Sequence, residues 1–327
     1  MLRRIRRGAF VAFAVITVLT TTRAYADPAT TSPEQGYDLG EIQTPRAVAM
    51  AGALTAMGTS TTALVLNPAN LPLARVYHFE GFAAVSPQAR RQSYGGAVAD
   101  SSTNRLAGGF AGTWNQMDPD GIKRTWTDMR LGVAYPFGDN FSAGLAGRYL
   151  RTEQGAASGP LGGSLASDGT RGAELFNAFT FDIGATVIPM KKLRIGVVGH
   201  NLTNPGTALA PTLISGGVGF THEIVVVEAD AVVDFTTWQK ARVRTMLGGE
   251  VFVADHFPLR LGYRYDDGMR THGISAGVGY IDRKWSFELS GRHDVAGDHP
   301  GTMLVAGLRF FYDAGRLAPD EADSVGY

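Results

Sequence analysis

Short segments in which apolar residues alternate with polar or small ones recur along most of this chain, with turn-forming residues between them. In residues 303–312, Leu304 and Phe310 fall on one side of the alternation and Arg309 falls on the other. Residues 258–265 repeat the pattern with leucines and tyrosines against two arginines. Because successive side chains of a β-strand point to opposite faces, each segment predicts a strand with one apolar and one charged face. An apolar face that carries aromatic residues in strand after strand is typical of a transmembrane β-barrel.

The pattern predicts an all-β fold, a 14-stranded antiparallel transmembrane β-barrel over residues 75–312. We expect strands at residues 75–86, 91–99, 104–114, 124–135, 141–152, 176–188, 193–202, 212–221, 224–235, 241–253, 258–265, 272–281, 285–293 and 302–312. An even number of strands is usual in bacterial single-chain barrels. Counted from the first strand, the even-numbered connections are short and most odd-numbered ones are longer, as in barrels with short periplasmic turns. A soluble all-β periplasmic protein is an alternative, but it gives no reason for this alternation.

The first 26 residues have the features of a secretory signal peptide. Four arginines precede residue 8, Gly8 to Thr20 is a short apolar run, and Ala24-Tyr25-Ala26 matches a cleavage site. The apolar run is too short to cross about 30 Å of hydrocarbon as a helix. We therefore expect cleavage after Ala26 and export to the outer membrane of a bacterial cell.

The charge and cysteine content narrow the function further. Residues 1–26 hold five of the 30 basic residues and no acidic one, which leaves 25 basic against 30 acidic residues and a net charge of −5. This balance argues against a nucleic-acid partner. The chain has no cysteine, so an exported form has no disulfides and depends on its sheet and core for stability.

The region before the first strand, residues 27–74, differs from the barrel. It begins with a polar lead. The stretch from Thr44 to Met57 is rich in alanine and methionine and predicts a short helix that begins near Pro45. A turn-forming cluster, Asn67-Pro68-Ala69-Asn70-Leu71-Pro72, follows. The apolar residues of this region have no other core to enter, so we expect it to fold inside the barrel as a plug. After the last strand, residues 313–327 predict a polar periplasmic tail.

Many glycines fall inside the expected strands. In a strand, a glycine lets a bulky group in the lumen or a neighbouring backbone approach closely. These glycines are Gly108, Gly109, Gly132, Gly144, Gly196, Gly217, Gly219, Gly277 and Gly279.

The stretch from Asp38 to Pro72 carries a family resemblance. Its Arg46, its Ala51-Gly52-Ala53 and its Asn67-Pro68-Ala69 resemble the N-terminal segment of the outer-membrane long-chain fatty-acid transporter (FadL-like) superfamily. The chain length and Gly199-His200-Asn201-Leu202 are also similar to the smaller PorV-type branch. The resemblance implies that the Asn-Pro-Ala element, Asn67, Pro68 and Ala69, belongs to a hatch that plugs a fourteen-stranded barrel.

The face of the strands opposite the apolar one is heavily charged. Alternation places in the lumen Asp128, Arg130, Arg148, Glu228, Asp230, Asp234, Arg242, Arg244, Glu250, Arg260, Arg264, Glu288, Arg292 and Arg309. One interpretation is a network of mutual ion pairs that stiffens the barrel and anchors the plug, because buried charges must be paired. The other is that some arginines, namely Arg260, Arg264, Arg292 and Arg309, bind a ligand carboxylate or phosphate.

No motif indicates an enzyme or a cofactor. The histidines do not cluster at metal-ligand spacing, Asp118-Pro119-Asp120-Gly121 lacks the remaining ligands of a calcium loop, and no serine-nucleophile or phosphate-binding motif occurs. We therefore expect a transporter or channel for hydrophobic small molecules such as long-chain fatty acids, gated by the hatch. The alternative is a PorV-type barrel that transports nothing and serves as a partner in protein secretion or surface assembly. Expected partners are outer-membrane lipid, the hydrophobic ligand and the barrel assembly machinery.

Overall fold

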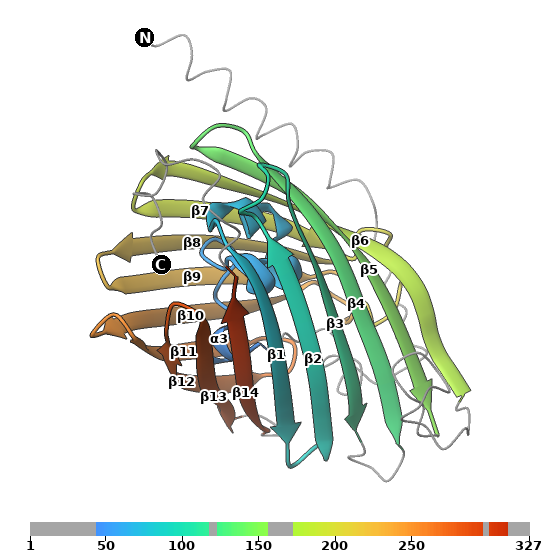
Figure 1. Ribbon diagram of the computed structural model, residues 1–327. Coiled ribbons are helices and arrows are strands. Elements are labelled where there is room, and N and C mark those ends of the chain that lie inside the picture. The colour runs from blue at the N-terminus through green and yellow to red at the C-terminus, as the bar shows by residue number, and fades with distance from the viewer. Residues whose placement is uncertain (1–43, 118–122, 156–172, 297–300, 313–327) are drawn as a thin grey trace.

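A computed structural model describes residues 44–117, 123–155, 173–296 and 301–312. Fourteen antiparallel strands form a closed barrel in which each strand pairs with its sequence neighbours and β14 pairs with β1 (Figure 1). The strands are β1 (Tyr77–Ser86), β2 (Arg91–Asp100), β3 (Ala107–Met117), β4 (Arg124–Pro136), β5 (Phe141–Gln154), β6 (Ala173–Met190), β7 (Leu193–His200), β8 (Leu213–His222), β9 (Val225–Asp234), β10 (Arg242–Val253), β11 (Phe257–Asp266), β12 (Thr271–Ile281), β13 (Trp285–Ala296) and β14 (Thr302–Phe311). The predicted fold class is confirmed, and the strand bounds lie within three residues of the predicted ones.

The outer surface of the wall is apolar. Leu261 is 70% exposed and Leu304 is 51% exposed, whereas Val305 and Arg260, their neighbours in sequence, are buried. In a single barrel with a filled interior, exposed leucine, valine and phenylalanine side chains on strand after strand are stable only against lipid. The period-two register predicted for these strands is therefore the observed one. Among the described residues, no helix is long and apolar enough to cross a membrane.

The wall is not equally tall around the barrel. β6 is 18 residues long, but β7 is only eight and pairs with the half of β6 near Met190. A last backbone hydrogen bond to β6 follows β7, from the N–H of Leu202 to the Phe181 carbonyl at 2.9 Å, and the chain then leaves the wall. The connection from residue 201 to 212 then turns inward, and residues 207–211 are buried.

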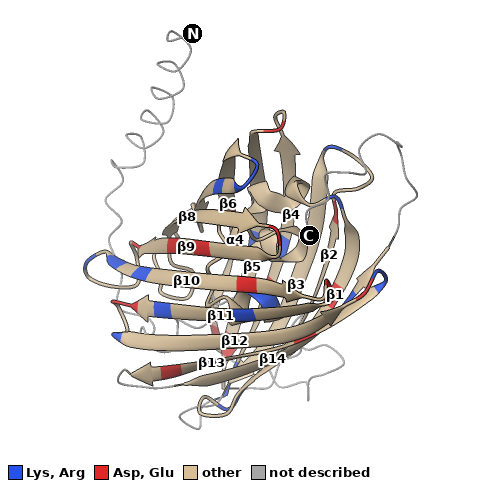
Figure 2. Ribbon diagram, turned by 90° about the vertical axis from the view of Figure 1, so that its left-hand side faces the viewer, with Lys and Arg blue, Asp and Glu red and all other residues tan. Residues whose placement is uncertain are grey.

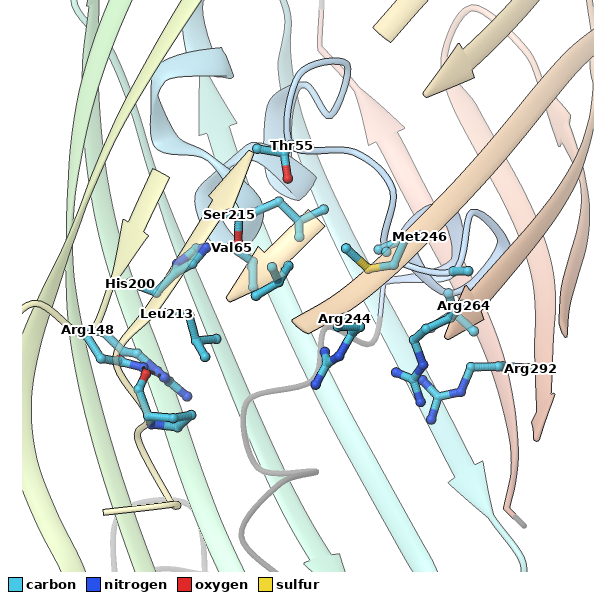
Figure 3. Close-up of a pocket in the computed structure, with 18 of the residues that line it drawn as sticks. Thr55, Val65, Arg148, His200, Leu213, Ser215, Arg244, Met246, Arg264 and Arg292 are labelled. Carbon is cyan, nitrogen blue, oxygen red and sulfur yellow. Dashed lines mark hydrogen bonds between the residues drawn. The ribbon is translucent and has the colours of Figure 1, made fainter. Parts of the chain in front are cut away.

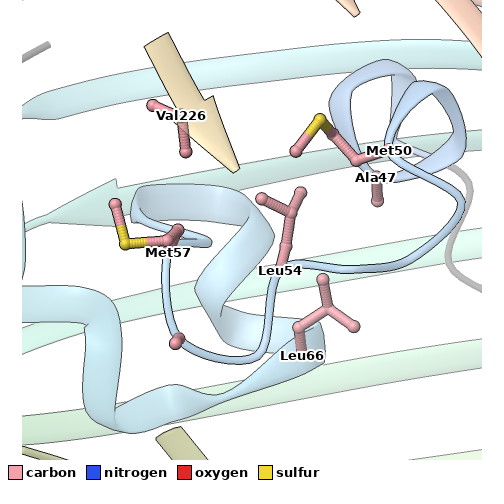
Figure 4. Packing of buried hydrophobic residues seen from close by; sticks show 7 residues of the cluster. Ala47, Met50, Leu54, Met57, Leu66 and Val226 are labelled. Carbon is pink, nitrogen blue, oxygen red and sulfur yellow. The ribbon is translucent and has the colours of Figure 1, made fainter. Parts of the chain in front are cut away.

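Residues 44–74, here called the inner segment, lie within the barrel (Figure 1). They contain four short helices: α3 (Pro45–Ala49), η2 (Ser60–Thr62), α4 (Ala63–Leu66) and η3 (Pro68–Leu73). A cluster in the interior joins α3, α4 and the residues between them to β9, and consists of Ala47, Met50, Leu54, Ala56, Met57, Leu66 and Val226 (Figure 4).

The helix predicted from Thr44 to Met57 is wrong in its extent. It begins at Pro45 as predicted, but it ends at Ala49. Ala51 and Gly52 have φ values of 55° and +89°, and this left-handed backbone stops a helix. The turn-forming cluster that begins at Asn67 is also more regular than predicted, because it forms the helix η3.

Several predictions fall outside the described residues. These are the signal peptide at residues 1–26 with cleavage after Ala26, the polar lead, the Asp118-Pro119-Asp120-Gly121 turn and the tail at residues 313–327.

Candidate functional site

A ring of glycines on the inner wall surrounds the inner segment. Each member lies so close to that segment that an added Cβ would contact or overlap it. The ring, here called the glycine ring, consists of Gly109, Gly132, Gly144, Gly184, Gly196, Gly219, Gly248, Gly262, Gly277 and Gly307, one from each of ten strands. At Gly144, for example, a Cβ would meet the backbone of Pro68 and Ala69. The wall thus admits the inner segment because these positions have no side chains.

Asn67 links two parts of the inner segment to the wall. It is fully buried, and its side-chain amide donates to the Thr55 carbonyl at 2.8 Å and to the Thr186 hydroxyl at 3.1 Å. Its side-chain oxygen accepts from the backbone N–H of Ala69 at 3.1 Å and caps η3. Ser142 on β5 donates to the Ala69 carbonyl at 2.7 Å. The Asn-Pro-Ala element therefore lies in the interior and fixes the segment's conformation.

Two carboxylates on β9 hold the part of the inner segment that follows α3. Asp230 accepts from the backbone N–H of Thr55 at 2.9 Å, and Glu228 accepts from those of Ala56 and Met57, the latter at 3.0 Å. In a longer helix these backbone N–H groups would donate to carbonyls of the same helix. Because the left-handed residues Ala51 and Gly52 end α3, the N–H groups donate to carboxylates of the wall instead.

An ion-pair network anchors α3. The guanidinium of Arg46 donates two hydrogen bonds to Glu250 on β10, at 2.9 and 3.2 Å. Glu250 also pairs with Arg260 on β11. Both wall residues are buried, so the network compensates for the desolvation of their charges.

The same network continues around the wall to the strand that follows the inner segment. Arg260 donates to Glu288 at 2.7 Å, Arg309 donates to Glu288 at 3.4 Å, and Arg309 donates to Glu80 at 3.1 Å. Glu80 in turn accepts a hydrogen bond from the Thr61 hydroxyl in η2. Figure 2 shows acidic residues within β9 and β10 and basic residues along β10 and β11, on the part of the wall that carries much of this network.

The four predicted ligand arginines separate into two pairs. Arg260 and Arg309 belong to the network, as in the first interpretation of the lumen charges. Arg264 and Arg292 instead line a cavity between the inner segment and the wall, together with Arg244 (Figure 3). Alternation along the strands could place all four in the lumen, but it could not tell which depth each one occupies relative to the inner segment.

The cavity has a volume of about 100 Å³. Apolar residues of the inner segment and of the wall form one part of its lining: Ala47, Val48, Ala51, Val65, Leu66, Leu213, Val232 and Met246. Arginines form the other part. Arg244 pairs with Asp266 at 2.8 Å, and Arg264 and Arg292 each approach one oxygen of Asp294 at 3.8 Å.

The opposite side of the cavity carries a tighter cluster. Arg148 donates to Asp128 at 2.7 Å, and Arg130 reaches Asp182 at 3.3 Å. His200 lies 3.0 Å from the same Asp182 carboxylate. Hydrogen bonds of 2.7 to 3.3 Å connect these side chains to the two aspartates.

Sequence analysis missed several of these residues. Glu80 and Asp182 lie inside predicted strands on the inward face, so period-two alternation extended to every strand would have found them. Arg46 was named only as part of the family resemblance, without a role, because the short helix on which it lies has no regular face from which its partner could be predicted. The inward connection between β7 and β8 was also missed. Its Leu209 and Ala210 pack against Trp126 near the start of β4.

Within the described ranges, no group of three or more histidine, aspartate or glutamate side chains is arranged to hold a metal ion.

No family model matches the sequence, and no curated protein matches it significantly. Solved structures do match the fold. The CymD monoaromatic hydrocarbon channel is 12% identical, with a TM-score of 0.64 over 84% of this chain and 98% of that one. The Ralstonia pickettii toluene transporter TbuX is 14% identical, with a TM-score of 0.61 over 84% and 100%. A Pseudomonas aeruginosa FadL homologue is 13% identical, with a TM-score of 0.57 over 82% and 98%. The resemblance predicted from the N-terminal motifs is therefore confirmed at the level of the fold: this chain has the FadL-type barrel.

Proposed function

We propose that this protein is an outer-membrane channel for hydrophobic small molecules, with the inner segment as its plug. The apolar outer surface suits a lipid environment, and the protein is inserted there by the barrel assembly machinery. The solved barrels that it resembles are described as hydrocarbon channels and transporters. None of them is described as an enzyme.

The cavity between plug and wall carries this proposal. A barrel that served only as a secretion partner has no need of a cavity beside its plug. Here Val65, Leu66 and Met246 line one that lies against the inner segment itself. Apolar residues combined with polar groups that fix orientation are usual in a small-molecule site, and this lining combines apolar side chains with arginines.

Gating by the plug is the second part of the proposal. Hydrogen bonds and ion pairs tie the inner segment to β1, β4, β5, β6, β9 and β10. Release of the whole segment would break all of these at once. A local shift of the stretch that borders the cavity, from Ala47 to Thr55, breaks far fewer hydrogen bonds: the bond from Thr55 to Asp230 on β9 and the bonds that the Thr55 carbonyl accepts from Asn67 and Asn70. We therefore place the gate in this stretch.

The test combines ion conductance with uptake. In planar bilayers the intact protein is expected to conduct poorly, and a variant that lacks residues 44–72 is expected to conduct strongly, because an empty fourteen-strand lumen admits water. In liposomes the intact protein is expected to admit toluene or a long-chain fatty acid such as oleate faster than protein-free vesicles do.

A cavity-filling variant separates transport from a structural role. Val65→Trp fills the cavity from the plug side, whereas Val218→Trp, at a position 50% exposed on the lipid face, serves as a matched control. We expect Val65→Trp to reduce uptake and Val218→Trp to leave it unchanged. If the intact protein admits no hydrophobic molecule while the deletion still opens the lumen, the PorV-type role as a secretion or assembly partner becomes the better hypothesis.

A further inference from the structure

The connection between β7 and β8, residues 201–212, folds into the barrel and is here called the inward connection. Its tip, residues 207–210, is buried. Through Leu209 and Ala210 the tip packs against one side chain on each of β3, β4 and β5, namely Met117, Trp126 and Leu150. None of these strands is a neighbour of β7 or β8. The tip therefore crosses the inside of the barrel instead of continuing its own part of the wall.

The tip, the cavity and the inner segment lie at three successive depths of the lumen. Along β4, Trp126 contacts the tip, Arg130 lines the cavity, and Gly132 lies against the inner segment. β5 runs the opposite way and repeats this order from its end, with Leu150, Arg148 and Gly144. The cavity thus has the inner segment on one side and the inward connection on the other.

Hydrogen bonds fix the neck of the inward connection, where the chain leaves and rejoins the wall. The backbone N–H of Asn201 donates to Asp182 on β6 at 2.8 Å, and its side-chain amide donates to the Pro211 carbonyl at 2.7 Å. Its side-chain oxygen accepts from Arg148 on β5 at 2.9 Å. Asn201 therefore joins the two ends of the connection to each other and to the wall, at the edge of the cavity.

The tip is held in a different way. Among the described residues, its hydrogen bonds stay within the connection, from the backbone N–H groups of Leu209 and Ala210 to Thr207. Its contacts with the wall are apolar. Displacement of the tip therefore leaves no hydrogen-bonding group of the wall unpaired, whereas displacement of the neck does. Gly206, with a φ of +73°, provides a left-handed residue between neck and tip.

We propose that the tip of the inward connection is a second gate, which closes the cavity on the side opposite the plug while the neck stays in place. His200 and Leu213, which flank the connection, border the cavity in Figure 3. Passage through the lumen then requires two separate movements, one of the tip and one of the inner segment. This inference rests on the proposed function and adds to it a barrier that the plug does not provide.

Thiol labelling of the full chain in lipid nanodiscs tests the second gate, because the chain has no cysteine of its own. Ser215→Cys places one thiol at a buried position of β8 that lines the cavity, and a small charged methanethiosulfonate reagent reports its accessibility. Leu209→Gln is expected to accelerate this labelling by about tenfold or more, because loss of a buried apolar side chain shifts a local equilibrium by at least that factor. Leu209→Ala, which stays apolar, is expected to give a smaller increase.

Asn204→Gly is the matched control within the inward connection. Asn204 is exposed and has a φ of 49°, which glycine adopts equally well. We expect it to change the labelling rate by less than about twofold, as is usual for surface substitutions. Equal labelling of Ser215→Cys in all of these chains, or fast labelling in the chain with an unchanged connection, would overturn the inference.

A second reporter separates opening of the gate from loosening of the whole fold. Ser142→Cys places a thiol on β5 beside Ala69 of the inner segment, where it is also buried but does not line the cavity. Leu209→Gln is expected to change its labelling by less than about twofold, because the inner segment keeps its own contacts. Faster labelling at both positions would assign the tip a structural role only and reject the gate.

Toluene uptake into liposomes separates failure of this inference from failure of the proposed function. Selective labelling at Ser215→Cys without uptake would keep the barrier formed by the tip and reject the channel. Uptake with equal labelling in all variants would keep the channel and reject the second gate.

Discussion

The inner segment has two contrasting surroundings within one lumen. Around most of its circumference, the glycine ring and short hydrogen bonds hold it against the wall, as at Gly144 and Asn67. Beside α3 it borders a cavity, where Arg264 and Arg292 stand at ion-pair distance from Asp294. Close packing makes the first region intolerant of a change in side-chain volume, whereas the second has space beside it.

This contrast separates the contacts that fix the inner segment from the space that remains beside it. The contacts that fix the inner segment are concentrated where its backbone touches the glycines of the wall. The cavity remains where long arginine side chains of the wall lie beside the segment. Four predictions test the comparison, from the largest expected effect to the smallest.

Loss of Glu250 is expected to have the largest effect. Glu250→Ala leaves the buried Arg260 and the half-buried Arg46 without this partner, and removal of one member of a buried ion pair costs about 3–5 kcal/mol of stability. Denaturant unfolding in lipid vesicles, followed by tryptophan fluorescence, measures the loss. Asp267→Ala, which removes the partner of the partly exposed Arg242, is the control and should change stability by no more than about 1 kcal/mol. Equal losses in the two variants would contradict the role of the network.

The second-largest loss of stability is expected when a side chain is added at a position of the glycine ring. In Gly144→Val the new side chain overlaps the backbone of Pro68 and Ala69, and overpacking of this kind costs about 1–3 kcal/mol. Gly249→Val on the lipid face, where no atom lies within 4 Å of the added Cβ, is the control and should be neutral or better. Because the chain has no cysteine, a single Val65→Cys probe reports by labelling rate whether the inner segment has loosened. Unchanged labelling and stability in Gly144→Val would argue against a closely fitted plug.

Asn67→Ala tests the Asn-Pro-Ala element. It removes the donor to the Thr55 carbonyl and the acceptor for the Ala69 N–H, and an unsatisfied buried group costs about 1–3 kcal/mol. Asn140→Ala also removes one hydrogen bond to a backbone carbonyl, but at an exposed turn. The expected result is a clear drop in the denaturant midpoint for the first variant and little change for the second; the reverse order would refute the structural role given to Asn67.

Two alanines of α3 compare the two surroundings within a single helix. The Cβ of Ala49 lies against Gly277, whereas Ala47 lines the cavity. Ala49→Val is expected to destabilise by about 1–3 kcal/mol and Ala47→Val by less than about 1 kcal/mol, because only the second has space beside it. Paired unfolding curves measure the difference. A larger loss in Ala47→Val would mean that the cavity closes in solution.

Much of the fold could be predicted from the sequence. Period-two alternation is a local property of the chain, so it located fourteen strands and the lipid-facing side of each, as at Leu261 and Leu304. The strand glycines likewise indicated close approach before their partners were known. Pro45 marked the start of a helix, and Gly52 was a local stop signal that the predicted extent to Met57 passed over. The left-handed backbone of Ala51, which packs against Gly262 on β11, had no such signal.

The candidate site was only half predictable, and the reason is geometric. Alternation determines which face of the wall a side chain joins, so it placed Arg260, Arg264, Arg292 and Arg309 together in the lumen. Depth along the lumen depends on the stagger of the strands and on where the inner segment packs, which are properties of the closed barrel. Only the tertiary structure therefore decided that Arg260 and Arg309 join the ion-pair network with Glu250, Glu288 and Glu80 while Arg264 and Arg292 line a cavity.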